Sequence, residues 1–414
     1  MAGNGTVTVI GAGIIGLCCA SYIQRHGRQV RVVDSVPPGR GTSFGNAGGL
    51  SSGACVPIAM PGIVKQIPKW LLDPEGPLVV RPGYLLKALP WLLQFIGSAK
   101  PERVERSADA ILALTRPLFE NLIPLARDAG VEGLIKRVGQ LHLYSTDAAF
   151  AGDARGREMR LRRGLKLDIL GAEEIRQMEP DLAPIFRHAV YFPDHGHCAD
   201  PLGLSEGLAA ELARRGGEIV QARVNDLEVG PDGVRAIVTE AGTLPVDELV
   251  IAAGAWSHGL AARLGHKVPL ESQRGYHAML AAPNVGPRRN VQWTERKFIA
   301  TPMEAGVRFA GTVEIAGLDA APDYRRADVL LKQGMDMFPG LKGGEVSRWM
   351  GHRPCIPDSV PVIGRSPTVR NVTFAFGHGH IGLICASTTG RLVAEIVSGA
   401  KPSIDPAPYR VDRF

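Results

Sequence analysis

Runs of apolar residues near the N-terminus predict a buried strand, a helix and a second strand. The run at 6–10 is nearly continuous and β-branched, as in a strand covered on both faces. Residues 13–27 predict an apolar helix that ends at Gly27, and 31–34 predict the next strand, which ends in an acid. This order of elements indicates a βαβ unit.

Later segments repeat both kinds of pattern. Residues 141–144 and 307–311 alternate apolar and polar side chains, which indicates antiparallel strands within a sheet-forming region at 268–350. Residues 248–254 are almost all apolar, which predicts another buried parallel strand. Helices are predicted at 104–129, with an irregularity at Pro117, at 203–215 and at 387–398, and a hairpin is expected around Pro231, Asp232 and Gly233.

The predicted segments are interleaved along the chain. Nucleotide-type segments occur near 5–50, 200–258 and 355–400, and the sheet-forming segments lie between them. This organisation argues against a simple succession of one nucleotide domain and one substrate domain. It predicts an interleaved α/β fold in which both domains are discontinuous.

A glycine-rich turn joins the first predicted strand to the first helix. Gly11, Gly13 and Gly16 form a G-x-G-x-x-G motif within the complete strand–turn–helix–strand frame. In such a turn the helix N-terminus directs N–H groups at a pyrophosphate. Asp34, at the end of the next strand, can accept hydrogen bonds from an adenosine ribose. The motif therefore predicts a dinucleotide site.

The composition limits the kinds of partner that the protein is expected to bind. The chain has 414 residues, 45% of them hydrophobic, and a net charge of +6 that is spread along the chain. Without a dense basic run nucleic-acid binding is not expected, whereas an anionic substrate or an anionic membrane surface suits the charge. No uncharged stretch is long enough for a transmembrane helix, and no signal peptide is expected. The six scattered cysteines are expected to be reduced, mostly buried thiols of a cytoplasmic protein.

Four segments together resemble the D-amino-acid oxidase superfamily of flavoproteins, and within it the D-amino-acid dehydrogenase small-subunit group. The similarity extends over nearly the whole chain. The segments are the fingerprint ending at Asp34, the loop Thr42-Ser43 with Asn46-Ala47-Gly48, the strand end 252–256, and the run 351–354 that continues through Asp358, Pro361 and Gly364 to the turn at 377–382.

The resemblance implies FAD as the cofactor, and glycine-rich turns at both ends of the chain suit such a long dinucleotide. It implies an FAD-binding domain of Rossmann type formed by 1–57, 200–258 and 355–414, and a substrate or cap domain on an antiparallel sheet formed by 58–199 and 259–354. The implied FAD contacts are Gly11, Gly13, Ile14, Ile15, Gly16, Asp34, Ser35, Thr42, Ser43, Asn46, Ala47, Gly48, Leu50, Val224, Ala253, Gly254, Trp256, Arg353, Gly379, His380, Ile381, Gly382 and Leu383.

Three residues are candidates for the catalytic site. The resemblance implies that Arg353 binds the substrate carboxylate, and a planar guanidinium can do so through two parallel hydrogen bonds. Tyr276 is a candidate pocket wall whose hydroxyl could also bond the carboxylate, although it could equally be a sheet-packing residue. His380 is expected in the turn beneath the flavin. His352 departs from the apolar residue common at that position, which leaves the polarity of the pocket open, and we assign no general base.

Two further segments have competing interpretations. The run His195-Gly196-His197-Cys198 contains metal-ligand types, but no second ligand pair at suitable spacing accompanies it, so we expect a turn and no metal. Residues 58–98 combine Trp70, Trp91 and basic residues with apolar ones. They could cap the active site, or they could contact the inner face of the cytoplasmic membrane peripherally.

The expected activity is FAD-dependent oxidation of a D-amino acid, D-proline or a hydroxy-D-proline being one candidate, by hydride transfer from the alpha carbon to the flavin. The imino acid would hydrolyse to a 2-oxo acid, and electrons would pass to a quinone or another acceptor that is not oxygen. The alternatives are an oxygen-using oxidase of glycine, sarcosine or a D-amino acid, a flavin-binding subunit of a larger complex, and an NAD-linked dehydrogenase.

Overall fold

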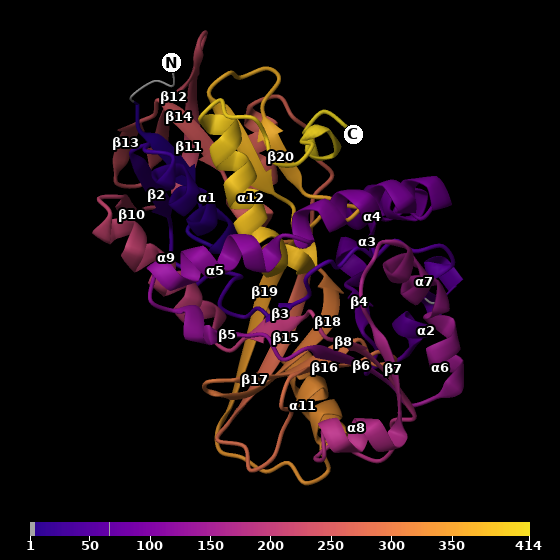
Figure 1. Ribbon diagram of the computed structural model, residues 1–414. Coiled ribbons are helices and arrows are strands. Elements are labelled where there is room, and N and C mark those ends of the chain that lie inside the picture. The colour runs from indigo at the N-terminus through magenta and orange to yellow at the C-terminus, as the bar shows by residue number, and fades with distance from the viewer. Residues whose placement is uncertain (1–4, 66) are drawn as a thin grey trace.

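The computed structural model describes residues 5–65 and 67–414. Its first sheet contains the βαβ unit expected from the N-terminal pattern, in the upper half of Figure 1. Neighbouring strands are parallel except for the last pair, and most side chains of the strands other than β10 are buried. The six strands, in spatial order, are β10 (Glu218–Gln221), β2 (Val30–Asp34), β1 (Val7–Ile10), β14 (Glu248–Ile251), β21 (Val372–Phe376) and β20 (Val362–Arg365).

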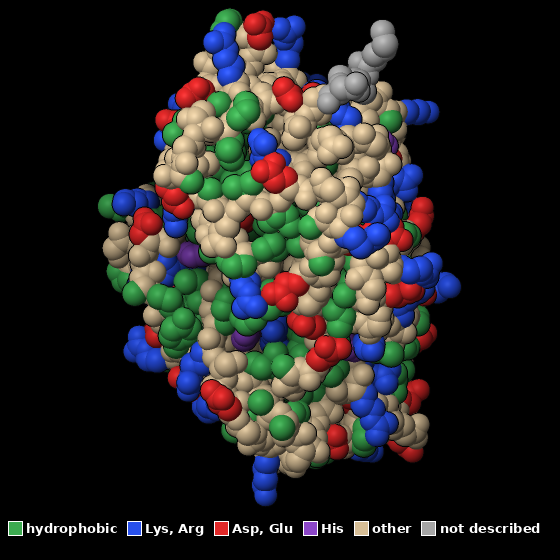
Figure 2. All heavy atoms as spheres, turned by 90° about the vertical axis from the view of Figure 1, so that its left-hand side faces the viewer, with side chains coloured by type: hydrophobic (Ala, Val, Ile, Leu, Met, Phe, Trp, Pro, Cys, Tyr) green, Lys and Arg blue, Asp and Glu red, His purple; other side chains and the backbone are tan. Residues whose placement is uncertain are grey.

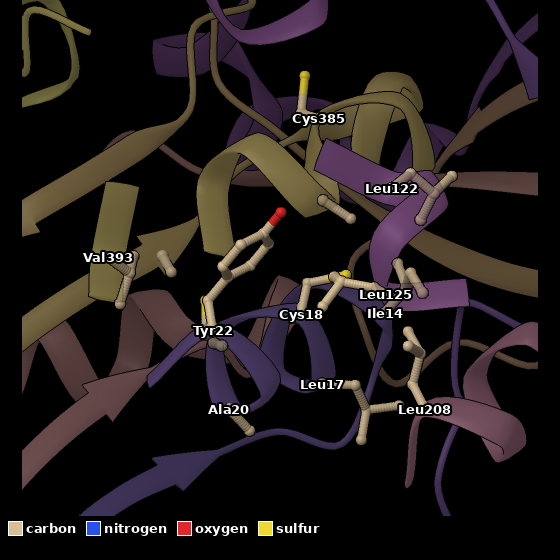
Figure 3. Close-up of a cluster of buried hydrophobic side chains, with 14 of the residues drawn as sticks. Ile14, Leu17, Cys18, Ala20, Tyr22, Leu122, Leu125, Leu208, Cys385 and Val393 are labelled. Atoms are coloured by element: carbon tan, nitrogen blue, oxygen red, sulfur yellow. The ribbon is translucent and has the colours of Figure 1, made fainter. Parts of the chain in front are cut away.

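One helical layer covers this sheet. Helix α1 packs along α12, where Gly390 of α12 meets the backbone of Cys18 so closely that a Cβ would clash with it. Figure 3 shows the shared core, in which Leu17, Tyr22, Leu122 and Val393 come together. The helices are α1 (Ile14–Arg25), α4 (Pro101–Thr115), α5 (Leu118–Asp128), α9 (Pro201–Arg214) and α12 (Gly382–Val397).

A larger, mostly antiparallel sheet occupies the lower half of Figure 1, with α11 (Arg325–Met337) and α8 (Ala172–Met178) against it. Its aromatic and aliphatic core includes Phe298 and Phe309. Its strands run in the order β19 (Val346–Cys355), β15 (Glu271–Ala281), β18 (Gly306–Ile315), β17 (Phe298–Met303), β16 (Asn290–Trp293), β6 (Gln140–Tyr144), β8 (His188–Phe192) and β7 (Asp168–Gly171), and β4 (Leu78–Val80) pairs with β18.

Two small sheets and several helices complete the fold. One sheet contains β3 (Gly49–Leu50), β9 (Gly196–Cys198) and β5 (Ile135–Lys136), and the other contains β11 (Val224–Gly230), β12 (Gly233–Thr239) and β13 (Gly242–Pro245). The remaining α-helices are α2 (Ile67–Leu72), α3 (Leu85–Ser98), α6 (Asp147–Gly152), α7 (Ala154–Arg162) and α10 (Ser257–Arg263). Within the described part of the chain, no helix has the length and apolarity needed to cross a membrane.

The α/β fold class predicted from the sequence is confirmed, as are the discontinuous first sheet and the hairpin between β11 and β12. The helix expected over 104–129 is wrong as a single element, because the chain forms α4 and α5 with a break at Arg116–Pro117. Proline has no N–H for the helical ladder, so a new helix starts after it. The domain boundaries stay a prediction. All six cysteines are buried, and none is paired within the described residues.

Candidate functional site

The fingerprint turn brings the N-terminus of α1 close to two other segments. Gly11 has a φ of +112°, and a Cβ on Gly16 would overlap the Gly11 carbonyl oxygen, so both positions require glycine. The helix starts at Ile14, whose N–H donates to Ser43 Oγ at 2.9 Å. The partly exposed Gly13 and Ile15 lie at the same turn. The N–H groups that follow Ile14 in the first turn of α1, together with the Ser43 hydroxyl, suit a pyrophosphate.

Asp34 lies beside this turn at the end of β2. One carboxylate oxygen accepts the Ala12 N–H at 2.7 Å, and the other accepts the Val36 N–H at 3.2 Å. Because Asp34 is paired with Gln221 at the end of β10, Val224 follows only a few residues beyond the same sheet edge. Ser35 and Val224 are half-buried there. The structure thus brings together the residues expected at the adenosine end.

The 42–50 loop extends from the fingerprint to the antiparallel sheet. Ser43 contacts α1 at one end, and Thr42 Oγ1 donates to the His352 carbonyl on β19 at 3.1 Å. Gly45 lies under the indole of Trp349, where any Cβ would overlap the ring. Leu50 is fully buried and pairs with Gly196 of β9. The loop therefore connects the fingerprint turn to β19, the strand that carries Arg353.

Two more turns meet the first sheet at the carboxyl ends of its strands. After β14 the chain passes through Ala253 and Gly254 to Trp256, which is 50% exposed and meets the His352 ring edge-on at 5.3 Å. After β21 the turn 377–381 leads into α12, which begins at Gly382. His378 is buried within this turn and bonds Thr389 at 3.0 Å. Ligands of open α/β sheets bind at this edge.

Arg353 lies on β19 and faces this second turn. Its guanidinium donates to the carbonyl oxygens of Thr312, at 2.7 Å, and Gly311, at 3.2 Å. No carboxylate among the described residues forms an ion pair with it. Burial lowers the pKa of Arg353 from its ordinary value, while part of its surface stays accessible. A desolvated cation that has no anionic partner and keeps an accessible surface suits an anionic ligand.

His380 lies close enough to Arg353 for the two to interact electrostatically. Burial, and secondarily the Arg353 charge, lowers the pKa of His380 to about 4. Yet His380 has an exposed side chain. Because this pKa lies well below 7, the imidazole is neutral at pH 7. The structure therefore brings five of the predicted site residues together where β19 meets the turn before α12: Arg353, His380, Gly379, Ile381 and Leu383.

The structure does not place the Tyr276 side chain beside Arg353 and His380. Arg353 lies over Gly275, where a Cβ would overlap the guanidinium, so Tyr276 points to the opposite face of β15. Its hydroxyl donates to Glu314 Oε2 at 2.5 Å and accepts the Asp323 N–H at 3.0 Å. This corrects the expectation of a pocket wall: Tyr276 is a core residue of the sheet, whose hydroxyl is already satisfied.

Sequence reasoning missed the residues that do share the face of Arg353. Trp349 and His277 stack with ring centroids 5.2 Å apart, and Phe44 lies edge-on to Trp349 at 6.1 Å. Trp349 is four residues before Arg353 in an alternating strand, a spacing that places both on one face. The spacing was a usable signal for Trp349. His277 could not be found this way, because it depends on the register between β15 and β19.

Residues 58–98 cover the end of β19 that carries Arg353. Trp91 donates through Nε1 to the Cys355 carbonyl at 3.1 Å and stacks on Phe95 at 5.2 Å. The Ile58 N–H donates to Ser359 Oγ at 3.1 Å. The segment thus contacts the chain just beyond Arg353, at Cys355 and Ser359. A cavity of about 390 Å³ opens beside it, lined by Tyr84, Lys87, His258, Glu271, Ser272 and Asp319 among others.

The His195–Cys198 run has other roles. His195 Nδ1 bonds Gln140 Oε1 at 3.0 Å, and the backbone of His197 pairs with Gly49 in the small sheet. Across the described residues, no group of three potential ligands is arranged to hold a metal ion.

These features fit FAD. Ile14 and its neighbours would hold the pyrophosphate, Asp34 the adenosine, and the 42–50 loop would lead the flavin towards Arg353. The arrangement thus suits a dinucleotide at the fingerprint and an anionic group beside Arg353.

Comparison with known proteins identifies the family. The chain matches the family model of FAD dependent oxidoreductases named DAO over residues 6–396, so it belongs to that family and uses FAD. It is 41% identical over 417 residues to a D-amino-acid oxidase of Bradyrhizobium diazoefficiens, covering 99% of this chain and 98% of the relative. It is 30% identical over 416 residues to a D-amino acid dehydrogenase of Rhizobium rhizogenes, covering 99% of each. The resemblance drawn from the sequence is therefore confirmed.

Solved structures show the same fold. The glycine oxidase of Geobacillus kaustophilus superposes with a TM-score of 0.75 at 23% identity, covering 99% of each chain. The L-proline dehydrogenase of P. horikoshii gives a TM-score of 0.75 at 19% identity, covering 100% of this chain and 98% of that one.

Proposed function

We propose that the protein oxidises a D-amino acid to an imino acid, which hydrolyses to a 2-oxo acid and ammonia. The observation that carries this proposal is the buried guanidinium of Arg353, which has backbone carbonyls but no carboxylate as partners. A substrate carboxylate would complete it. The names of the relatives support an amino acid as the substrate, and two of them specify the D configuration.

The residues of the chain would orient the substrate and exclude water. FAD, when bound, supplies the acceptor for the hydride from the alpha carbon. Arg353 would hold the carboxylate through two hydrogen bonds and so fix where the alpha carbon lies. His380, neutral at pH 7 because of its lowered pKa, would add no second positive charge to repel the amino group. Residues 58–98 would close the site over Cys355.

Which side chain the substrate carries is determined by testing a panel of amino acids. D-proline and the hydroxy-D-prolines belong in it, because their imines persist as rings, together with acyclic D-amino acids, glycine, sarcosine and the L-enantiomers. Initial rates with a redox dye, and release of a 2-oxo acid from the acyclic substrates, test the proposal. Turnover of L-amino acids alone, or of none, would reject it.

For the electron acceptor we propose a membrane quinone. The observation that favours it is a row of exposed apolar side chains on α2 and α3, the outer side of the segment that covers Arg353. Lys65, Lys87 and Lys100 are exposed nearby, as suits an anionic bilayer. The exposed apolar residues are Leu71, Leu72, Leu85, Leu86, Leu89, Leu93 and Ile96, of which Leu72 and Leu86 are each 83% exposed.

Flotation with anionic phosphatidylglycerol vesicles at low salt tests this contact. The double variant Leu86→Asp/Leu93→Asp should lose flotation, whereas Leu161→Asp, on the exposed side of α7, should not. Equal flotation of all three proteins, or none by the wild type, would reject the membrane contact.

Oxygen is the second candidate acceptor, because the relative at 41% identity is named an oxidase. Peroxide formed in step with substrate turnover would support oxygen and reject the quinone.

On the large face shown in Figure 2, basic and acidic side chains are interspersed, without one dense basic field.

A further inference from the structure

Four consecutive carbonyl groups of the 42–50 loop accept hydrogen bonds from side chains of the antiparallel sheet. The donors come from three different strands, β15, β17 and β18. All three donor residues are more than nine-tenths buried, so these bonds are shielded from water. The bonds run from Arg308 Nη1 to the oxygens of Phe44 (3.0 Å) and Asn46 (2.6 Å), from His277 Nδ1 to Gly45 (3.2 Å) and from Thr301 Oγ1 to Ala47 (2.7 Å).

Because a trans peptide directs its N–H opposite to its C=O, this arrangement fixes the N–H groups on the side away from the sheet. Two of them are satisfied locally: the Asn46 N–H bonds the Ser43 carbonyl at 3.2 Å, and the Gly48 N–H bonds Asn46 Oδ1 at 2.8 Å. The N–H groups of Gly45 and Ala47 have no partner among the described residues. They are two donors oriented in advance.

A row of buried polar side chains fixes the orientation of Thr301, one of the three side chains that donate to the loop carbonyls. Thr301 Oγ1 accepts from Asn290 Nδ2 at 2.6 Å, so its own proton is directed at the Ala47 carbonyl. Asn290 Oδ1 in turn accepts from Gln140 Nε2 at 2.5 Å, and Gln140 Oε1 accepts from Ser51 Oγ at 2.7 Å. Each of these side chains has its orientation determined by the next. This row of hydrogen bonds starts at Ala47 within the loop and ends at Ser51, the residue that directly follows the loop.

The loop begins at the fingerprint and reaches the strand of Arg353. FAD that is bound at the fingerprint with its flavin beside Arg353 would lie along this loop. We propose that Thr301, Arg308 and His277 are positioning residues that aim the Gly45 and Ala47 N–H groups at the flavin and thereby raise its reduction potential. Aligned donors stabilise the negative charge that reduction brings to the flavin. The inference deepens the proposed function, because it names what sets the driving force at that same site.

The experiment measures the flavin midpoint potential of the holoenzyme against a redox dye, with a chemical reductant. Thr301→Val removes the donor to Ala47 with little change in volume. We expect the oxidised-to-reduced ratio at a fixed potential to rise about tenfold, a fall of about 30 mV for a two-electron couple. Thr301→Ser keeps the hydroxyl and should restore the wild-type potential. Thr373→Val is the control, since Thr373 is fully buried and its hydroxyl has no partner.

His277→Phe is the second variant, because it removes the donor to Gly45 and keeps an aromatic ring against Trp349. It should lower the potential as well, and FAD affinity from flavin fluorescence should fall in both variants. Potentials equal to the wild type in both Thr301→Val and His277→Phe would overturn the proposal. Because the reductant is not an amino acid, this result is independent of whether the proposed substrate is correct.

Discussion

Replacing Arg353 by Met should separate binding of the substrate from stability of the fold. Arg353 is a desolvated cation whose partners are two backbone carbonyls and no carboxylate. Arg308 also bonds backbone carbonyls without an acid, but it is only 5% exposed, whereas Arg353 keeps part of its surface accessible to a ligand. Removing an uncompensated buried charge relieves a desolvation cost. We therefore expect the free energy of unfolding of Arg353→Met to equal or exceed that of the wild type.

The loss of activity follows from the bonds that Arg353 would make to substrate. A hydrogen bond to a charged group contributes about 1.5–3 kcal/mol, so two bonds contribute about 3–6 kcal/mol. At about 1.4 kcal/mol per factor of ten, kcat/KM should fall by about 10²- to 10⁴-fold. Arg353→Lys keeps the charge but not the planar pair of donors, and should recover only part of this loss.

The assay combines steady-state kinetics with a dye acceptor, urea unfolding, and flavin absorbance to confirm that FAD is bound. Arg348→Met is the matched control on the same strand, because Arg348 forms an exposed ion pair with Asp328, of the kind that contributes about 0–1 kcal/mol. Unchanged kcat/KM in Arg353→Met would refute the reasoning. So would a large loss of stability that accounts for the lost activity.

Three further predictions follow from the geometry. Gly16→Ala should abolish FAD binding, because its Cβ would overlap the Gly11 carbonyl oxygen, whereas Gly41→Ala should bind FAD normally, because nothing lies within 4 Å there; flavin retained by Gly16→Ala after gel filtration would disprove this. Tyr276→Phe should lower the free energy of unfolding by about 1–3 kcal/mol through the lost bond to Glu314, and leave KM unchanged; a raised KM with unchanged stability would return Tyr276 to the pocket. Burial lowers the pKa of His195 to about 3, below its unfolded value, so the stability that this neutral histidine contributes is complete above pH 6.5 and is lost as the pH falls. Urea unfolding should therefore show about 1.4 kcal/mol less stability at pH 5.5 than at pH 7.5 from this group. A His195→Gln variant that keeps the full pH dependence would contradict this.

Much of the first sheet could be predicted, because its signals are local. The apolar run of β1, the glycine turn and the acid that ends β2 are contiguous in sequence, and the structure assembles them as expected. The break at Pro117 also had a local cause. Its consequence, two helices, depended on how α5 packs against α12, which the sequence pattern does not contain.

The face of the antiparallel sheet could not be predicted in the same way. Whether Tyr276 or its neighbours face Arg353 depends on the pairing of Gln273 with Arg353, a register set by strands far apart in sequence. Shifting that register by one residue would exchange the two faces. Arg308 and Thr301 escaped notice for the same reason, since their partners are carbonyls of a loop more than two hundred residues away. Side chains that bond backbone have no residue-type signature.

Anaerobic reduction of the bound flavin by a panel of enantiomeric amino acids tests the central claim most directly. The measurement needs no acceptor, so it is independent of the choice between quinone and oxygen. The account predicts that at least one D-amino acid bleaches the flavin absorbance, that its L-enantiomer does not, and that Arg353→Met slows the bleaching by about 10²- to 10⁴-fold. Flavin that stays oxidised with every D-amino acid, or that Arg353→Met reduces as fast as the wild type, would contradict it.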